Sequence, residues 1–236
     1  MHITARDRLG AATGAAFVAL LLVGNALSIA GTGPSSHPTG EQVLKDTAHQ
    51  ASSTGATVGI VLEFVGLAAF IAFLGFLADV LLRRTGEGQP GMSGRVAVVA
   101  GIATLAVKLG GAAPFLTLLL DRRQLSPQLA LILNDMNGAA FVLSWLPFAV
   151  FVGAAATALR QTGLVGRPTA YVGHVLGIAG LALALVGVTD PINATPVAFL
   201  LGLVWLLVVS VRLGVKPAIE APVDRVRPRS VVPVGA

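Results

Sequence analysis

Two ionisable side chains stand inside long apolar runs of this 236-residue sequence, and they are the first candidates for chemistry. Lys108 lies near the middle of the run 96–120, and Glu63 lies within the preceding run 55–84. A charged Lys at the centre of a bilayer costs about 2.5–3.5 kcal/mol on insertion scales. This amine must therefore be paired, hydrated or deprotonated, and the elements around it must supply that environment.

The spacing along the chain favours a direct pair between Glu63 and Lys108. Counted from the outer ends of their helices at about 1.5 Å per residue, Glu63 lies roughly 12 Å and Lys108 roughly 18 Å below the outer surface. A lysine stem can bridge the difference of about 6 Å, and the short connection 85–95 makes the two segments neighbours. Three interpretations stay open: a pair that lines a binding site, a pair that only fixes helix register, and side chains that face lipid in neutral form.

Further polar side chains are expected to complete a polar pocket in the outer half of the same bundle. Three of them fall at a depth of roughly 8–10 Å, and three lie at the outer ends of apolar segments. The predicted wall residues are Asn25, Ser144 and Trp145, and the predicted mouth residues are Asp135, Asn137 and Asp190. Together with Glu63 and Lys108 they form the hypothesised binding site.

The composition excludes an ordinary soluble domain. Hydrophobic residues make up 55% of the chain and charged residues only 11%, whereas soluble domains carry about 25% charged residues. Six apolar runs are each long enough to cross about 30 Å of hydrocarbon. The sequence therefore predicts an all-α polytopic membrane protein whose six spans cover about 9–30, 55–84, 96–120, 138–160, 169–189 and 194–213, followed by a disordered basic cytoplasmic tail at 215–236.

The distribution of Lys and Arg predicts the orientation. With the N-terminus inside, the cytoplasmic segments hold twelve of these residues and the outer loops hold three. Cytoplasmic loops of membrane proteins carry such an excess of positive charge. Both termini are therefore expected in the cytoplasm, and the protein in the plasma membrane.

Capping patterns predict two further helix starts. Thr39-x-x-Gln42 is a capping-box pattern that opens a short helix through about residue 50. Ser126-Pro127 is a helix start with Ser as N-cap and Pro in the first turn. From there an amphipathic lead-in is expected to lie at the membrane interface and to run into the span 138–160.

Two questions of organisation stay open in the sequence. Residues 1–30 read either as the first span or as a cleaved signal peptide. The ends of the second and fourth spans also resemble each other at 82–86 and 159–163, and the spans that follow open alike, with Arg95 corresponding to His174. This pattern indicates a duplicated helix hairpin, whose alternative is coincidence in a chain rich in small apolar residues.

Motifs of the common catalytic classes are absent from the sequence. The chain has no nucleotide-binding loop, no zinc-protease motif, no nucleophile-elbow motif and no cysteine. The spacing of His37, Glu41, Asp46 and His49 matches no recognised metal-ligand pattern. We therefore expect no cofactor and no metal, and the net charge of +5 is explained by cytoplasmic loops rather than by nucleic acid.

The link Leu159-Arg160-Gln161-Thr162-Gly163-Leu164-Val165-Gly166-Arg167-Pro168, the polar first loop and the span pattern carry a resemblance. In these features the chain resembles a group of uncharacterised six-span bacterial membrane proteins, typical of actinobacteria, that is defined as a domain of unknown function. The group implies a six-helix fold and no particular activity.

Three classes of function are compatible with these features. The leading hypothesis is a membrane protein that binds or moves a small solute or a lipid through the outer-half pocket without covalent chemistry. The second is a structural or accessory subunit whose Glu63–Lys108 pair only holds the bundle together. The third is a lipid-modifying enzyme in which Glu63 acts as acid or base and Lys108 tunes it. The expected partners are the lipid bilayer and a small-molecule or lipid ligand, and a homo-oligomer stays open.

Overall fold

The computed structural model describes residues 5–30, 38–85, 91–189 and 195–215, and the regular structure in these ranges is helical. Six helices are long and apolar enough to cross a membrane, which confirms the predicted all-α polytopic fold. The elements are α1 (Ala5–Ser28), α2 (Gly40–Ser52), α3 (Thr54–Thr85), α4 (Met92–Asp121), α5 (Pro127–Gln161), α6 (Arg167–Thr189) and α7 (Val197–Val215).

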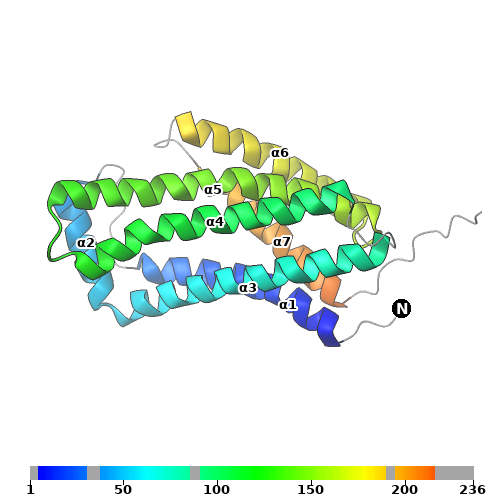
Figure 1. The fold of residues 1–236 in the computed structure, drawn as a ribbon, viewed down its shortest axis with the longest axis horizontal. Coiled ribbons are helices and arrows are strands. Elements are labelled where there is room, and N and C mark those ends of the chain that lie inside the picture. Colours follow the sequence, from blue (N-terminus) through cyan, green and yellow to red (C-terminus); the bar gives the residue numbers. More distant parts are fainter. Residues whose placement is uncertain (1–4, 31–37, 86–90, 190–194, 216–236) are drawn as a thin grey trace, which may run out of the picture.

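The long helices form one elongated bundle (Figure 1). α1 packs along α3, α5 packs along both α4 and α6, and α7 packs mainly against α1 and also against α6. By contrast, α3 and α4 contact each other over a much shorter length, although they are consecutive in the chain. α1 is thus an integral member of the bundle, and it places Phe17, Val18 and Leu21 in the core.

The spanning helices differ in length. α3, α4 and α5 have 32, 30 and 35 residues, whereas α1, α6 and α7 have 24, 23 and 19. A hydrocarbon layer of about 30 Å needs only about 20 helical residues. α1 begins and α7 ends at the same end of the bundle, and α4 and α5 extend beyond the other spanning helices at the opposite end (Figure 1). We call this opposite end the outer end, following the predicted orientation.

The short helix α2 lies across the outer end, where it contacts α3, α4 and α5 (Figure 1). Its start was predicted correctly, because Thr39 is the N-cap and its side chain accepts a hydrogen bond from Gln42 N at 3.2 Å. Val43 of α2, Leu118 of α4 and Ala130 of α5 form a small apolar cluster that is separate from the main core. α2 therefore closes off the protruding ends of α4 and α5.

The lead-in before the fourth span and the span itself form one helix. Ser126 caps this helix through Leu129 N at 3.3 Å, as expected, and the helix continues without a break as α5. Ala130 packs against α2 and α4, whereas Leu129, Ile132 and Met136 are exposed. The interfacial position of the lead-in and the start of the span at residue 138 stay predictions.

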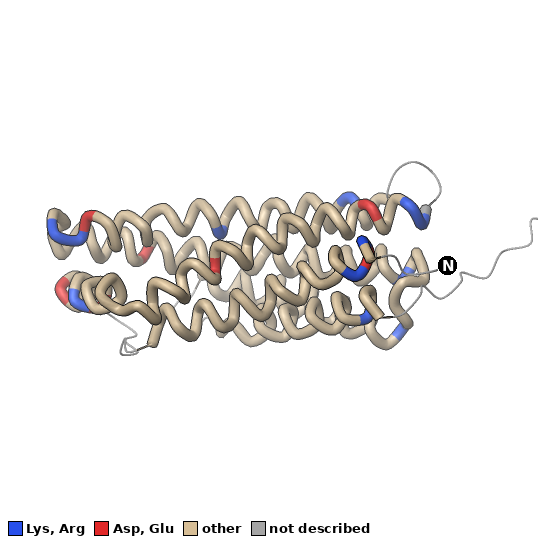
Figure 2. The backbone as a smooth tube through the Cα atoms, turned by 90° about the horizontal axis from the view of Figure 1, so that it is seen from below, with Lys and Arg blue, Asp and Glu red and all other residues tan. Residues whose placement is uncertain are grey.

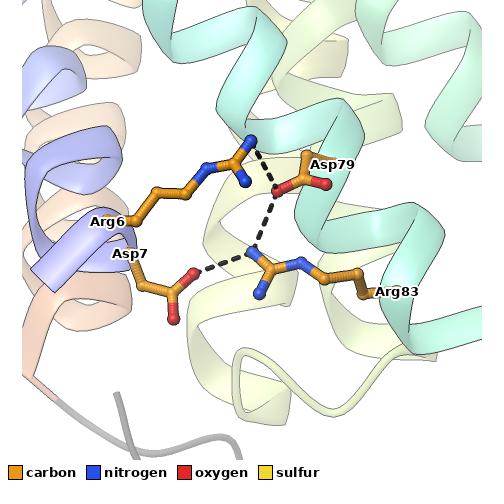
Figure 3. A network of polar contacts seen from close by, with 4 residues as sticks. All are labelled: Arg6, Asp7, Asp79 and Arg83. Atoms are coloured by element: carbon orange, nitrogen blue, oxygen red, sulfur yellow. Dashed lines mark hydrogen bonds and ion pairs between the residues drawn. The ribbon is translucent and has the colours of Figure 1, made fainter. Parts of the chain in front are cut away.

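The charged residues gather toward the two ends of the bundle (Figure 2). At the end with the termini, Arg83 of α3 contacts Asp7 of α1 at 2.7 Å and Asp79 of its own helix at 3.1 Å. Arg6 lies 4.0 Å from the same Asp79 carboxylate (Figure 3). This network joins the start of α1 to the end of α3.

The proposed duplication stays a prediction. The two hairpins that it relates, α3–α4 and α5–α6, pack differently, since α5 and α6 are in close contact and α3 and α4 are not. His174 lies about two helical turns inside α6, where its Nε2 is 2.8 Å from the Thr157 hydroxyl of α5. The predicted basic tail from residue 216 onward falls outside the described residues.

Candidate functional site

The candidate side chains lie at different distances along their own helices from the arginines near one end of the bundle. These arginines are Arg8, Arg84, Arg95, Arg160 and Arg212, on α1, α3, α4, α5 and α7. Lys108, Trp145 and Phe199 each lie about 20 Å along their own helix from these arginines, and Ser28 and Glu63 lie about 30 Å along theirs. The arginines are not level, because Gly101, close after Arg95, faces Leu74, which lies farther from Arg84. These lengths therefore do not give a difference in height between Glu63 and Lys108.

Glu63 lies beside the outer end of α1. Its Oε1 accepts a hydrogen bond of 3.0 Å from Ser28 Oγ, and Ser28 is the last residue of α1. The Ser28 carbonyl in turn accepts a bond of 3.1 Å from Gln50 Nε2 of α2. Glu63 is half-buried, and this polar cluster joins α1, α2 and α3.

Close helix packing fixes the position of Glu63. A Cβ added to Gly24 of α1 would lie 2.6 Å from Gly59 O and 2.8 Å from Glu63 Cγ. A Cβ added to Gly59 of α3 would lie 2.6 Å from Gly24 O and 2.7 Å from Ser28 N. Small residues let two membrane helices approach to this distance. The two glycines thereby bring Ser28 within hydrogen-bond range of Glu63.

Lys108 has aromatic neighbours. Its Nζ lies 4.0 Å from the ring centre of Phe141 on α5 and 5.4 Å from that of Phe199 on α7. The two rings contact each other edge to face at 5.8 Å. An ammonium over an aromatic face is attracted by the ring quadrupole, by about 2 kcal/mol when desolvated. This contact supplies part of the environment that the sequence demanded for the amine.

The expected direct pair between Glu63 and Lys108 is not formed. Among the described residues, every ion pair within 4.0 Å lies in the Arg6–Asp7–Asp79–Arg83 network. Glu63 is bonded to Ser28 of α1 instead, and the Lys108 amine lies over the rings of Phe141 and Phe199. The two charges are still near enough to interact electrostatically.

The remaining candidates are not brought together as one pocket wall. Ser144 is fully buried and donates its hydroxyl proton to Phe141 O of its own helix, so it offers nothing to a ligand. Asn25 is exposed on α1, because the face of that helix next to α3 is occupied by Gly24 and Ser28. Asp135 is exposed and Asn137 half-buried on α5, and Asp190 falls outside the described residues.

Trp145 is the candidate that does border a cavity. The cavity lies between α5, α6 and α7 and has a volume of about 10 Å³, which is room for about one water molecule. Trp145, Thr195, Ala198 and Phe199 are among its lining residues. The Trp145 side chain is buried, and its Nε1 has no hydrogen-bond partner.

Sequence reasoning missed the residues that surround the candidates. Phe141 and Phe199 are far apart in the chain and carry no polar signature, so their meeting at Lys108 depends on how α5 and α7 pack. Phe141 precedes Trp145 by one helical turn, which is the only local indication of an aromatic face. Ser28 and Gln50 were read as a helix end and a loop helix, and only the packing of α1 and α2 joins them to Glu63.

No family model, curated protein or solved structure matches this chain.

Proposed function

We propose that this membrane protein binds or moves a small solute or a lipid in the outer half of the bundle, with Lys108 and Glu63 as its polar contacts. The observation that carries the proposal is the state of the Lys108 ammonium. It has aromatic neighbours, but no hydrogen-bond acceptor is found for it in the described part of the chain. An acceptor must therefore come from water or from a ligand.

Energetics support the need for such an acceptor. An ammonium carries three N–H donors, and aromatic faces do not satisfy them as oxygen atoms do. The aromatic contact is worth about 2 kcal/mol, against an insertion cost of at least about 2.5–3.5 kcal/mol. The attraction of Glu63 lowers the remaining cost from a distance but supplies no hydrogen-bond acceptor. The N–H donors of the amine therefore still need an oxygen atom from water or from a ligand.

The surroundings leave Lys108 and Glu63 within reach. Both side chains are half-buried, and Leu109 and Gly110 next to Lys108 are exposed. The close approach of α3 and α4 at Leu74 and Gly101 lies nearer the end with the termini. α3 and α4 contact each other over only a short length. This arrangement supports an approach of a lipid or an amphipathic solute to Lys108 and Glu63 from the side of the bundle.

Native mass spectrometry of the protein, released gently from its own membrane, tests this proposal. We expect a co-purified molecule on the wild-type chain that is lost in Lys108→Met and kept in Lys45→Met, whose lysine is exposed on α2. An adduct that survives Lys108→Met, or wild-type protein that carries none in its native lipid, would contradict the proposal.

One observation favours a second, structural function. Through Phe141 and Phe199 the Lys108 ammonium connects α4 to α5 and α7. In this alternative the amine is a clamp between helices, and Lys108→Met would loosen the bundle without changing any bound molecule.

We also infer the location from the charge distribution. The arginine-rich end with both termini supports a cytoplasmic position for that end and a plasma-membrane location for the chain. Membership of the six-span bacterial group rests on the resemblance of the 159–168 link and of the span pattern.

A further inference from the structure

Two hydrogen-bond donors have no acceptor among the described residues, and both lie around the Phe141 ring. The first is Lys108 Nζ, which lies 4.0 Å from the Phe141 ring centre and 5.4 Å from that of Phe199. The second is Nε1 of Trp145, whose ring meets Phe141 edge to face at 5.4 Å. Phe199 also lines the cavity that Trp145 borders. The two donors therefore share Phe141 as a neighbour.

The Trp145 indole is an exception among buried polar groups. Only 4% of its surface is exposed, and its N–H has no partner, whereas the other tryptophan, Trp205, donates to Thr169 O at 2.8 Å. A buried donor without an acceptor costs about 1–3 kcal/mol. Such a donor beside a cavity can bond the acceptor atom of a water or of a bound molecule.

The start of α7 adds positive potential at this place. α7 begins at Val197, inside the bundle, and its first-turn residues Ala198 and Phe199 line the cavity together with Thr195. The N-terminus of a helix carries partial positive charge and attracts anions. A cation, an indole N–H and a helix N-terminus thus act in the same sense.

Among the described residues, no carboxylate forms an ion pair with Lys108. The Ser144 hydroxyl is bonded to Phe141 O, and the Thr195 hydroxyl accepts from Val197 N at 3.4 Å. Glu63 is bonded to Ser28 and acts on the Lys108 charge only from a distance. An acceptor that carries negative charge would therefore meet the amine directly.

We infer that the ligand is an oxyanion, a carboxylate or phosphate group, whose charge is answered by Lys108 and one of whose oxygens accepts from Trp145 Nε1. The cavity has room for one oxygen-sized group, so the rest of the ligand stays outside it. This inference rests on the proposed function and adds the chemical class of the ligand. The oxyanion can belong to an acyl-chain amphiphile or to a small free anion, and the experiment separates the two.

The indole N–H signals of ¹⁵N-labelled protein in dodecyl maltoside micelles provide the test. The chain has two tryptophans, so Trp145→Phe assigns both signals, and Trp205 serves as the internal control because its N–H is already bonded. The probes are decanoate, inorganic phosphate and decyltrimethylammonium. We expect decanoate to shift the Trp145 signal downfield and saturably, and to leave the Trp205 signal in place.

Matched variants test whether the positive charge of Lys108 is the one that binds the anion. Lys108→Met should weaken the decanoate response at least tenfold, Lys108→Arg should keep most of it, and Lys45→Met should leave it unchanged. An unchanged Trp205 signal shows that each variant is folded. If Lys108→Met does not fold, isothermal titration of decanoate to Trp145→Phe replaces it, with an expected loss of at least fivefold.

The outcomes separate the possibilities. A response to phosphate as well as to decanoate identifies a free oxyanion as sufficient, and a response to decanoate alone identifies an acidic amphiphile. An equal response to decyltrimethylammonium, or no shift of the Trp145 signal with either anion, overturns the inference. Because native mass spectrometry judges binding at Lys108 independently of ligand charge, the proposed function can stand when this inference fails.

Discussion

Lys108 of α4 places its ammonium nitrogen 4.0 Å from the centre of the Phe141 ring on α5. A cation inside an apolar bundle is thus met by a π-face instead of a carboxylate. The ring quadrupole attracts the charge but leaves the N–H donors free. The ring therefore attracts the Lys108 side chain, while the N–H groups of the amine can still donate hydrogen bonds.

Replacing the Lys108 amine by the Met thioether tests whether the amine destabilises the protein when no ligand is bound. Lys108→Met keeps an unbranched side chain and removes both the insertion cost and the aromatic attraction. Because the cost of about 2.5–3.5 kcal/mol exceeds the gain of about 2 kcal/mol, the ligand-free variant should be more stable by about 1 kcal/mol. Unfolding of delipidated protein in micelles measures this, and a marked loss of stability would favour the structural function.

A double-mutant cycle measures the contact itself. Phe141→Leu removes the ring under the ammonium together with the edge-to-face contacts to Trp145 and Phe199. Combined with Lys108→Met, it should show a coupling free energy of about 1–2 kcal/mol, as expected for a desolvated cation–π contact. Phe148→Leu is the control. The Phe148 ring also packs against Phe199, but among the described residues it makes no cation–π contact with the Lys108 amine, so this variant should couple weakly. Additive effects for Phe141 would mean that the ring does not hold the charge.

The helix contact under Glu63 gives a prediction with a control on the same helix. In Gly59→Ala the new Cβ would lie 2.6 Å from Gly24 O, so α1 and α3 must separate, and we expect a loss of about 1–3 kcal/mol. Gly75→Ala places its Cβ where no atom lies within 4 Å and should be neutral or stabilising by up to about 1 kcal/mol. Thermal unfolding of both variants compares them, and equal stabilities would contradict the close packing.

The Ser28 hydroxyl, which donates to Glu63, can be compared with the Ser210 hydroxyl, which has no hydrogen-bond partner among the described residues. Ser28→Ala removes the bond to a buried carboxyl group and should cost about 1.5–3 kcal/mol if the group is ionised. Ser210→Ala removes a buried hydroxyl that has no partner and should be neutral or stabilising. Unfolding midpoints of the two variants decide the matter. The order of effects would be reversed if Glu63 did not depend on Ser28.

The network at the opposite end is predicted to be weak and sensitive to salt. Arg83→Gln loses contacts to Asp7 and Asp79, and partly exposed pairs of this kind contribute about 0.2–1 kcal/mol each. The destabilisation should shrink as salt is raised from low ionic strength to 1 M, because screening shortens to about 3 Å. Arg84→Gln, at the neighbouring position, is the control and should show little dependence on salt. A loss that does not change with salt would indicate packing rather than charge.

Hydropathy and capping were enough to predict most of the fold. The six spans follow from local composition, and Thr39 and Ser126 satisfy backbone N–H groups within their own first turns, so both helix starts could be predicted. What packs against the first part of α5 could not be predicted from its amphipathic pattern. Ala130 packs against α2 and α4, whereas the apolar residues Leu129, Ile132 and Met136 are exposed.

The site was harder to predict than the fold because it depends on relative heights. Lys108 and Glu63 were correctly marked as unusual, since the cost of burying a charge is a property of the residue and its span. Their partners, Phe141 and Ser28, are set by how far each helix extends and by the glycines that let α1 approach α3. Counting residues from a helix end cannot supply that information when the ends are not level.

The unequal helix lengths have a consequence for the surrounding lipid. α7 has 19 residues, about 28 Å, whereas α5 has 35, about 52 Å. The helices around the protein therefore differ in the length that they present to the lipid. Lipids adjust to such mismatch by stretching or thinning locally, at a fraction of a kcal/mol per Å. The leaflet that meets the recessed start of α7 is therefore under the greatest deformation, and acyl-chain length becomes a variable that acts on this protein.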